Sequence, residues 1–100
     1  MRLKEKVAIV TGGAKGLGRA FAVKMAAEGA RVMVVTRRDM DNLKKTVRQI
    51  EDSGGQAAFF QADVSKEADT LAMAEETVKA FGRIDILINN AAVYDGITRK

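Results

Sequence analysis

The chain has 100 residues, of which 47% are hydrophobic and 30% are charged, a composition typical of a single globular domain. It contains no cysteine and no histidine. The sequence therefore excludes disulfides, zinc sites built on thiolate or imidazole ligands, and Cys–His or Ser–His nucleophile pairs.

The net charge is only +4, from 17 Lys and Arg against 13 Asp and Glu. A nucleic-acid-binding domain usually carries a stronger basic stripe with aromatic residues between the charges, whereas this chain has one Tyr, four Phe and no Trp. We therefore expect no nucleic-acid partner, and a basic nucleic-acid binder is the least favoured alternative. The basic excess is local and favours an anion site. It comes mainly from Arg37, Arg38, Lys44, Lys45 and Arg48.

No segment approaches the roughly 20 consecutive apolar residues of a membrane span. The first apolar run, Val7–Val10, is also too short for a signal peptide and ends at a glycine pair. We expect a soluble, cytoplasmic protein with no membrane partner.

The first elements are a buried strand at Val7–Val10 and, after a glycine-rich turn, a helix from Leu17 to about Glu28. Gly29 is suited to end that helix, and Arg31–Val35 is a second apolar, β-branched strand. The apolar residues of the helix recur at fourfold spacing: Leu17, Phe21 and Met25.

The second helix is predicted over Met40–Asp52 and a third strand over Gln56–Gln61. Ser65 is the predicted N-cap of a third helix, Gly82 closes it, and Ile84–Ile88 is the fourth strand. The predicted inner stripes of these two helices are Leu43, Val47 and Ile50, and Leu71, Ala74, Val78 and Phe81.

Strands that are apolar on both faces and alternate with helices predict a parallel sheet covered on both sides. Right-handed crossovers then give an α/β, doubly wound, Rossmann-like sheet of four strands in the order 3-2-1-4 with three crossover helices. Residues 1–100 form one unit. Its fourth strand would leave an apolar edge without a partner, which is an aggregation liability. We therefore expect a unit incomplete at its C-terminus and belonging to a larger sheet.

The most informative segment is Thr11–Gly18, which lies between the first strand and the first helix. A helix N-terminus presents unpaired N–H groups and partial positive charge, so this junction suits a phosphate or pyrophosphate. It is not a Walker loop, because Arg19 stands where a Lys-Ser/Thr pair is needed, and Phe21 breaks the common G-x-G-x-x-G fingerprint. The spacing is T-G-x-x-x-G-x-G. Gly12, Gly16 and Gly18 suit a sharp turn, a close approach of backbone to ligand, and close helix–strand packing.

This spacing resembles the short-chain dehydrogenase/reductase family. Asp63-Val64 after the third strand, Asn89-Asn90-Ala91-Ala92 after the fourth, and the basic pair after the second match the family pattern at the expected places. The resemblance covers essentially all 100 residues. It implies the nicotinamide-dinucleotide-binding half of an oxidoreductase that exchanges a hydride with an alcohol or carbonyl substrate.

The resemblance also implies the cofactor contacts. In relatives the glycine turn holds the pyrophosphate, an Asp-Val pair contacts the adenine, and an Asn-Ala pair lies near the adenosine ribose. Helix capping near Ser65 is the alternative for Asp63. Carried over, the contacts of the turn are Gly12, Lys15, Gly16, Leu17 and Gly18, and those of the later motifs are Asp63, Val64, Asn90 and Ala91.

The residue at the end of the second strand selects the cofactor in the family, where an acidic side chain favours NAD. Here Thr36 is followed by Arg37 and Arg38, and guanidinium groups suit a 2′-phosphate. We therefore expect NADP(H) in preference to NAD(H), with NAD(H) as the alternative. The alternative interpretation is that the two arginines only begin a solvent-exposed loop and bind no phosphate.

The family's catalytic residues, a Ser and a Tyr-x-x-x-Lys pair, are not found in this chain. Tyr94 is the only tyrosine, and Thr98 stands four residues later where a lysine would be needed. We predict no catalytic residue and no metal site here, weak cofactor binding and no turnover by this chain alone. The parent enzyme is expected to form a homo-oligomer, as relatives often form tetramers. A non-catalytic dinucleotide-binding regulatory module is the alternative.

Overall fold

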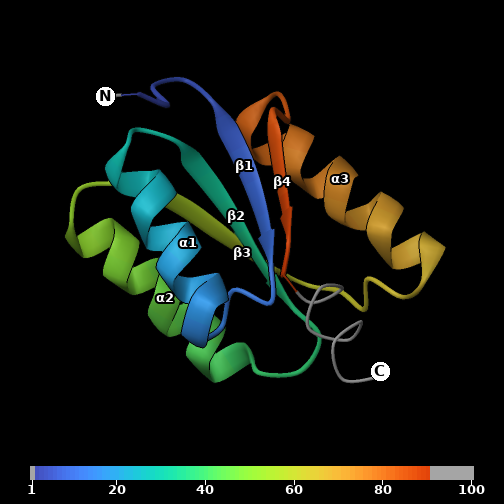
Figure 1. Ribbon diagram of the computed structural model, residues 1–100. Coiled ribbons are helices and arrows are strands. Elements are labelled where there is room, and N and C mark those ends of the chain that lie inside the picture. Colours follow the sequence, from blue (N-terminus) through green and yellow to red (C-terminus); the bar gives the residue numbers. More distant parts are fainter. Residues whose placement is uncertain (1, 91–100) are drawn as a thin grey trace.

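The computed structural model describes residues 2–90. Its elements alternate strand and helix along the chain (Figure 1). In order they are β1 (Val7–Thr11), α1 (Gly16–Ala27), β2 (Arg31–Thr36), α2 (Met40–Asp52), β3 (Gln56–Gln61), α3 (Glu67–Phe81) and β4 (Ile86–Asn89).

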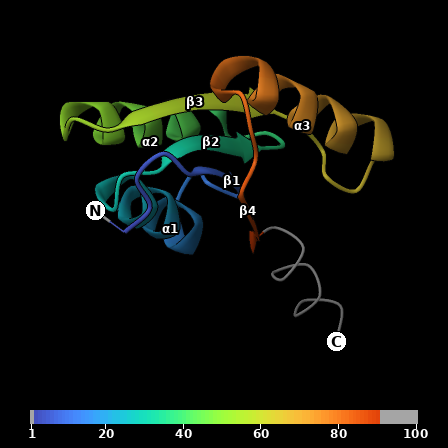
Figure 2. The ribbon, with the colours of Figure 1, turned by 90° about the horizontal axis from the view of Figure 1, so that it is seen from above.

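The four strands form one parallel sheet in the order β3-β2-β1-β4, which confirms the predicted topology. The helices cover both faces: Figure 2 shows α1 and α2 on one side of the sheet and α3 on the other. Because all strands run the same way, their carboxyl ends lie at one end of the molecule, where Thr11 is in register with both Val35 and Asn89. In doubly wound sheets this end binds ligands.

The core has two layers, one on each face of the sheet. Val10, Val32 and Val34 face α1 and α2, whereas Ile9, Met33 and Val35 face α3. β1 and the middle of β2 are completely buried. This alternation explains why Val7–Val10 of β1 and Val32–Val35 of β2 are apolar at every position: each strand has helices on both sides.

The second helix and third strand have the predicted bounds, and Leu43, Val47 and Ile50 of α2 are buried as predicted. Gly82 closes α3 in the left-handed conformation at φ 89°, also as predicted.

The predicted inner stripes of the other two helices are only partly correct. On α1, Met25 packs against the core as predicted, but Leu17 and Phe21 are 67% and 40% exposed, and the fully buried residues are Gly18 and Ala22. Gly18 packs directly on the backbone of the glycine turn, where a larger side chain would not fit.

On α3, Phe81 packs against the core as predicted, but Leu71 and Val78 are exposed, and the buried residues are Met73 and Thr77.

Two predicted boundaries also change. The N-cap of α3 is Lys66, not Ser65, because the Ser65 hydroxyl donates to the Asp63 carboxylate at 2.6 Å. The fourth strand begins at Ile86 instead of Ile84. At Asp85 the backbone N–H donates to the Val7 carbonyl at 2.9 Å, but the Val7 N–H donates to the Asp85 carboxylate, which also binds Arg83, so a side chain takes one of the ladder positions there.

Candidate functional site: a cleft at the carboxyl ends of the strands

A cleft of about 600 Å³ lies at the carboxyl ends of the strands, within the size range of small-molecule and cofactor sites. The glycine turn after β1, the end of β2 and the segment after β3 form its walls. One further lining residue, Asn90, directly follows β4. It is lined by Thr11, Gly12, Ala14, Lys15, Gly16, Leu17, Val35, Thr36, Arg37, Asp39, Ala62, Asp63, Val64, Ser65 and Asn90.

Glycines shape the turn between β1 and α1. Gly12 and Gly16 have φ values of 67° and 61°, a region that L side chains rarely adopt, and both line the cleft. Gly18 does not line it. A Cβ on Gly18 would lie 1.8 Å from the Gly12 carbonyl oxygen, so its hydrogen lets the helix pack directly on the turn. The positive φ of Gly12 fits the predicted sharp turn and Gly18 gives close packing, here against the turn itself, whereas the close approach of backbone to ligand at Gly16 stays a prediction.

The start of the turn is fixed by hydrogen bonds to neighbouring segments. The Gly13 N–H donates to the Val35 carbonyl of β2 at 3.1 Å, and the Asn90 side-chain amide donates to the Gly12 carbonyl at 3.5 Å. The Thr11 hydroxyl donates to the Asn89 side-chain oxygen at 3.0 Å. Asn89, the last residue of β4, and Asn90, which follows it, therefore support the first strand and its turn, a side-chain role that sequence reasoning did not assign to Asn89.

The end of β2 places a cation beside the cleft. The Arg37 carbonyl accepts from the Gln61 amide at 3.0 Å, which ties this segment to β3. The Arg37 guanidinium is 58% exposed and lies 4.0 Å from the Asp63 carboxylate, a long and weak ion pair that leaves it able to bind an anion. Arg38 is exposed and does not line the cleft.

Asp63 faces Arg37 from the segment after β3. Its Oδ1 accepts from the Ser65 hydroxyl at 2.6 Å and from the Ser65 N–H at 3.0 Å. These two hydrogen bonds, with a smaller contribution from Arg37, hold the pKa of Asp63 below its ordinary value of 3.8. The residue is thus a carboxylate at neutral pH. It does not cap α3, which begins after Lys66.

Asp39 is a cleft residue that sequence reasoning missed. It is the N-cap of α2, where its carboxylate accepts from the Asn42 N–H at 3.4 Å and from the Asn42 side-chain amide at 2.9 Å. These bonds, the side-chain one first, lower the pKa of Asp39, and the charges of Lys15 and Arg19 lower it further. An Asp directly before the predicted helix start was the available signal.

Comparison with known proteins decides the family. The family model described as short chain dehydrogenase matches residues 6–100. The chain belongs to the short-chain dehydrogenase family. Its sheet order and glycine turn are therefore those of a family of oxidoreductases that bind a nicotinamide dinucleotide.

Among the relatives is the short-chain dehydrogenase/reductase homolog YusS of Bacillus subtilis, 42% identical over 93% of this chain and 85% of YusS. The 3beta-hydroxysteroid dehydrogenase 1 of Eggerthella lenta is 45% identical, but the match covers 91% of this chain and only 35% of that enzyme. A solved metagenomic short-chain oxidoreductase in complex with NADP has a TM-score of 0.83 at 38% identity, over 90% of this chain and 40% of that one.

The structure brings most of the dehydrogenase-type site residues together. Nine of the predicted residues line one cleft: Gly12, Lys15, Gly16, Leu17, Thr36, Arg37, Asp63, Val64 and Asn90. Gly18 and Arg38 stand beside it, as described above. Ala91 and Tyr94 lie outside the described residues.

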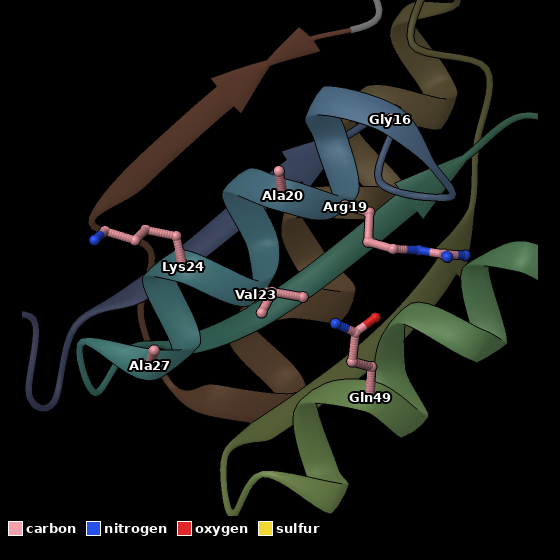
Figure 3. A pocket seen from close by; sticks show the side chains of 7 residues that line it. All are labelled: Gly16, Arg19, Ala20, Val23, Lys24, Ala27 and Gln49. Carbon is pink, nitrogen blue, oxygen red and sulfur yellow. The ribbon is translucent and has the colours of Figure 1, made fainter.

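A second, shallower groove of about 510 Å³ lies on the outer surface of α1 (Figure 3). It shares only Gly16 with the cleft, and its floor is formed by Ala20, Val23 and Ala27 with Gln49 of α2 at the side. Such a surface lacks the convergent polar groups of a ligand site. We assign it no function.

Residues 2–90 contain neither a metal-binding cluster nor a membrane-spanning helix. No group of three or more His, Cys, Asp or Glu side chains in this range is placed to hold a metal ion. No helix in it has the length and apolar character needed to cross a bilayer.

Proposed function

We propose that the chain is the NADP(H)-binding part of an oxidoreductase that exchanges a hydride with an alcohol or carbonyl substrate. The observation that carries the choice of NADP(H) is the charge at the end of β2. Thr36 and Arg37 line the cleft there, Lys15 lines it from the glycine turn, and no carboxylate occupies the strand end. Of the two carboxylates that line the cleft, Asp39 is engaged in capping α2, and Asp63 forms only a long ion pair with Arg37 at 4.0 Å.

The described residues fit such a dinucleotide. The left-handed glycines give backbone N–H groups at a helix N-terminus room to approach a diphosphate. Arg37, with Thr36 beside it, would hold the 2′-phosphate, because a guanidinium offers both charge and a forked set of donors. Asp63 and Val64 would contact the adenine, and Asn90 would lie beside the ribose. The bound nicotinamide would supply the hydride.

The rest of the assignment concerns the parent protein. The chain spans about a third of the steroid dehydrogenase, 35% of its length, so catalytic groups for the hydride transfer would be contributed by residues that this chain does not contain. A cytoplasmic homo-oligomer is part of the same proposal. So is a larger sheet beside β4, which the 54% exposure of Leu87 on that strand supports.

Isothermal titration of the chain with NADPH and with NADH tests the cofactor. We expect NADPH to bind at least about tenfold more tightly, since one charge-assisted hydrogen bond contributes roughly 1.5–3 kcal/mol. Equal affinities, or tighter NADH binding, would reject NADP(H) in favour of NAD(H) or of a cofactor-independent role for the arginines.

A second candidate is a non-catalytic dinucleotide-binding module. The match to YusS favours it, because 85% coverage makes that family member only slightly longer than this chain. An assay of NADPH oxidation by the full-length parent protein, with a panel of aldehydes and ketones, separates the two, because this chain alone is expected not to turn over substrate in either case. NADPH binding without oxidation supports the module, and substrate-dependent oxidation supports the enzyme.

A further inference from the structure

Arg19 lies on the first turn of α1, and its side chain leaves that helix toward α2 (Figure 3). Its Nε donates to the Thr46 hydroxyl at 2.9 Å, and its Nη2 donates to the carbonyl oxygens of Ala14 at 2.6 Å and Asn42 at 2.9 Å. One guanidinium therefore joins the glycine turn to two successive turns of α2. Arg19 does not line the cleft, so these contacts are its structural role.

Thr46 completes the connection from the middle of α2. Its side chain is fully buried, and its hydroxyl donates to the Gly13 carbonyl at 2.8 Å. A hydroxyl has one proton to donate and can accept at the same time. Thr46 thus accepts from Arg19 and donates to Gly13, which forms a continuous chain of hydrogen bonds from α1 through α2 to the turn.

These bonds determine which way the turn's peptide groups face. A trans peptide is planar, so its N–H points opposite to its carbonyl. Thr46 and Arg19 hold the carbonyls of Gly13 and Ala14 toward α2, which directs the N–H groups of Ala14 and Lys15 the other way. Both of these residues line the cleft.

We propose that Arg19 and Thr46 are positioning residues that hold the N–H groups of the glycine turn in the orientation needed to bind a diphosphate. The inference rests on the proposed function for its ligand. It adds a link between the two phosphate-binding regions, because Asn42, which Arg19 also holds, binds the Asp39 carboxylate that follows Arg37 and Arg38. Loss of Arg19 or Thr46 should weaken diphosphate binding at the turn more than 2′-phosphate binding at the end of β2, because these residues hold two carbonyls of the turn.

The decisive variant is Thr46→Val, which keeps the shape of the side chain and removes its hydroxyl. Thr46→Ser keeps the hydroxyl and should restore binding. Thr77→Val is the matched control. Thr77 is also fully buried and its hydroxyl donates to the Met73 carbonyl at 2.8 Å, but it lies on α3, on the opposite face of the sheet. Arg19→Met gives an independent variant if Thr46→Val does not fold.

The first measurement is calorimetric titration with ADP, which carries the diphosphate, and with adenosine 2′-monophosphate, which lacks it. Loss of a hydrogen bond within a network corresponds to roughly a three- to tenfold change in affinity. Thr46→Val and Arg19→Met should weaken ADP binding by about that factor and change binding of the monophosphate less than about twofold. Equal losses for both ligands, or no rescue by serine, would overturn the proposal.

The second measurement needs no ligand. The backbone amide chemical shifts of Ala14 and Lys15, read by nuclear magnetic resonance, should change in Thr46→Val and return toward the wild-type values in Thr46→Ser. Unchanged shifts in the valine variant would refute the positioning role. If the wild-type chain binds neither nucleotide, the proposed function fails, and the chemical shifts still decide the role of Arg19 and Thr46.

Discussion

The two outer strands of the sheet differ in how well their exposed sides are covered. β3 pairs with β2 over six residues, and its Phe59 lies under the Lys44 ammonium of α2 at 5.7 Å. β4 pairs with β1 over four residues and leaves Leu87 54% exposed on the face that carries α3. Both edges are partly exposed, with Phe59 at 42%, but the β3 edge, called here the covered edge, has the longer pairing and a lysine over its phenylalanine, so the β4 edge is the less protected of the two.

The position of the cleft reflects this difference between the two edges. The cleft residues come from the ends of β1 and β2 and from the segments after β1, β2 and β3, whereas β4 contributes none and only Asn90, directly after it, lines the cleft. The proposed nucleotide-binding cleft thus lies over β1, β2 and β3, whereas the edge of β4 is open and could pair with an additional strand. Changes at the turn and at the β2 end should affect folding or binding, whereas changes at the β4 edge should affect association.

The largest effect is expected from Gly18→Ala on the packed side. The added Cβ would lie 1.8 Å from the Gly12 carbonyl oxygen, so the turn or the helix must move. We expect a loss of about 3 kcal/mol in unfolding free energy, as for an overpacked core. Urea denaturation measures it. Gly54→Ala is the control for backbone strain alone, because Gly54 has φ 91° and open space around its Cβ position. Similar losses in the two variants would contradict the packing role.

Next is Arg37→Asp at the end of β2. Replacing the guanidinium by a carboxylate should weaken NADPH binding at least about tenfold relative to NADH, because a charge-assisted bond is lost and a 2′-phosphate is repelled. Competitive titration of the two nucleotides measures the ratio. Arg48→Asp makes the same charge change on the exposed surface of α2 and should leave the ratio unaltered. An unchanged preference in Arg37→Asp would remove the cofactor assignment.

A smaller effect is expected at the open edge. Leu87→Lys should change the unfolding free energy by less than about 0.5 kcal/mol, since the side chain is largely exposed. It should shift the chain toward monomer in sedimentation velocity, because an edge lysine opposes strand pairing. Phe59→Lys on the covered edge should instead destabilise the fold without changing association. If Leu87→Lys were the more destabilising of the two, the contrast between the edges would be wrong.

The smallest effect concerns acid stability near the start of β4. The Val7 N–H, followed by the Arg83 guanidinium, holds the pKa of Asp85 below its ordinary value of 3.8. A carboxylate with a lowered pKa stabilises the fold above that value, and this contribution is lost as the pH falls through the folded pKa. The stability gap between wild type and Asp85→Asn should therefore be present at pH 7 and shrink by pH 3. Urea midpoints at both values measure it, with Asp52→Asn as the charge-matched control. A gap that stays constant would show that the Asp85 charge contributes nothing.

Much of the fold was predictable from local pattern. The bounds and inner stripe of α2 are correct because its polar and apolar residues separate cleanly at helical spacing. The Ala-rich α1 has no such separation, and its large residues Leu17 and Phe21 were wrongly assigned to the core. The contact with the sheet is made by Gly18 and Ala22 because the turn approaches so closely, and that distance is a property of the folded chain.

The site residues that belong to a sequence motif could be predicted. Contacts between side chains that are far apart in the sequence could not. The glycine turn and Arg37 follow from spacing and from position after a strand. The Arg19–Thr46 bond joins residues 27 apart, and the Arg37–Asp63 pair joins β2 to the segment after β3. Thr46 has no local signature, because a threonine inside a helix is ordinarily only a weaker helix former. Arg37 and Asp63 were each predicted from a motif, but their contact with one another was not.

The most direct test of the whole account is a nuclear magnetic resonance titration of the chain with NADPH. If the strand–helix turn binds the diphosphate, the backbone amide signals of residues 12–17 should shift most strongly, together with those of residues 36 and 37. Saturable shifts confined to other parts of the chain, with the turn unmoved, would contradict the account.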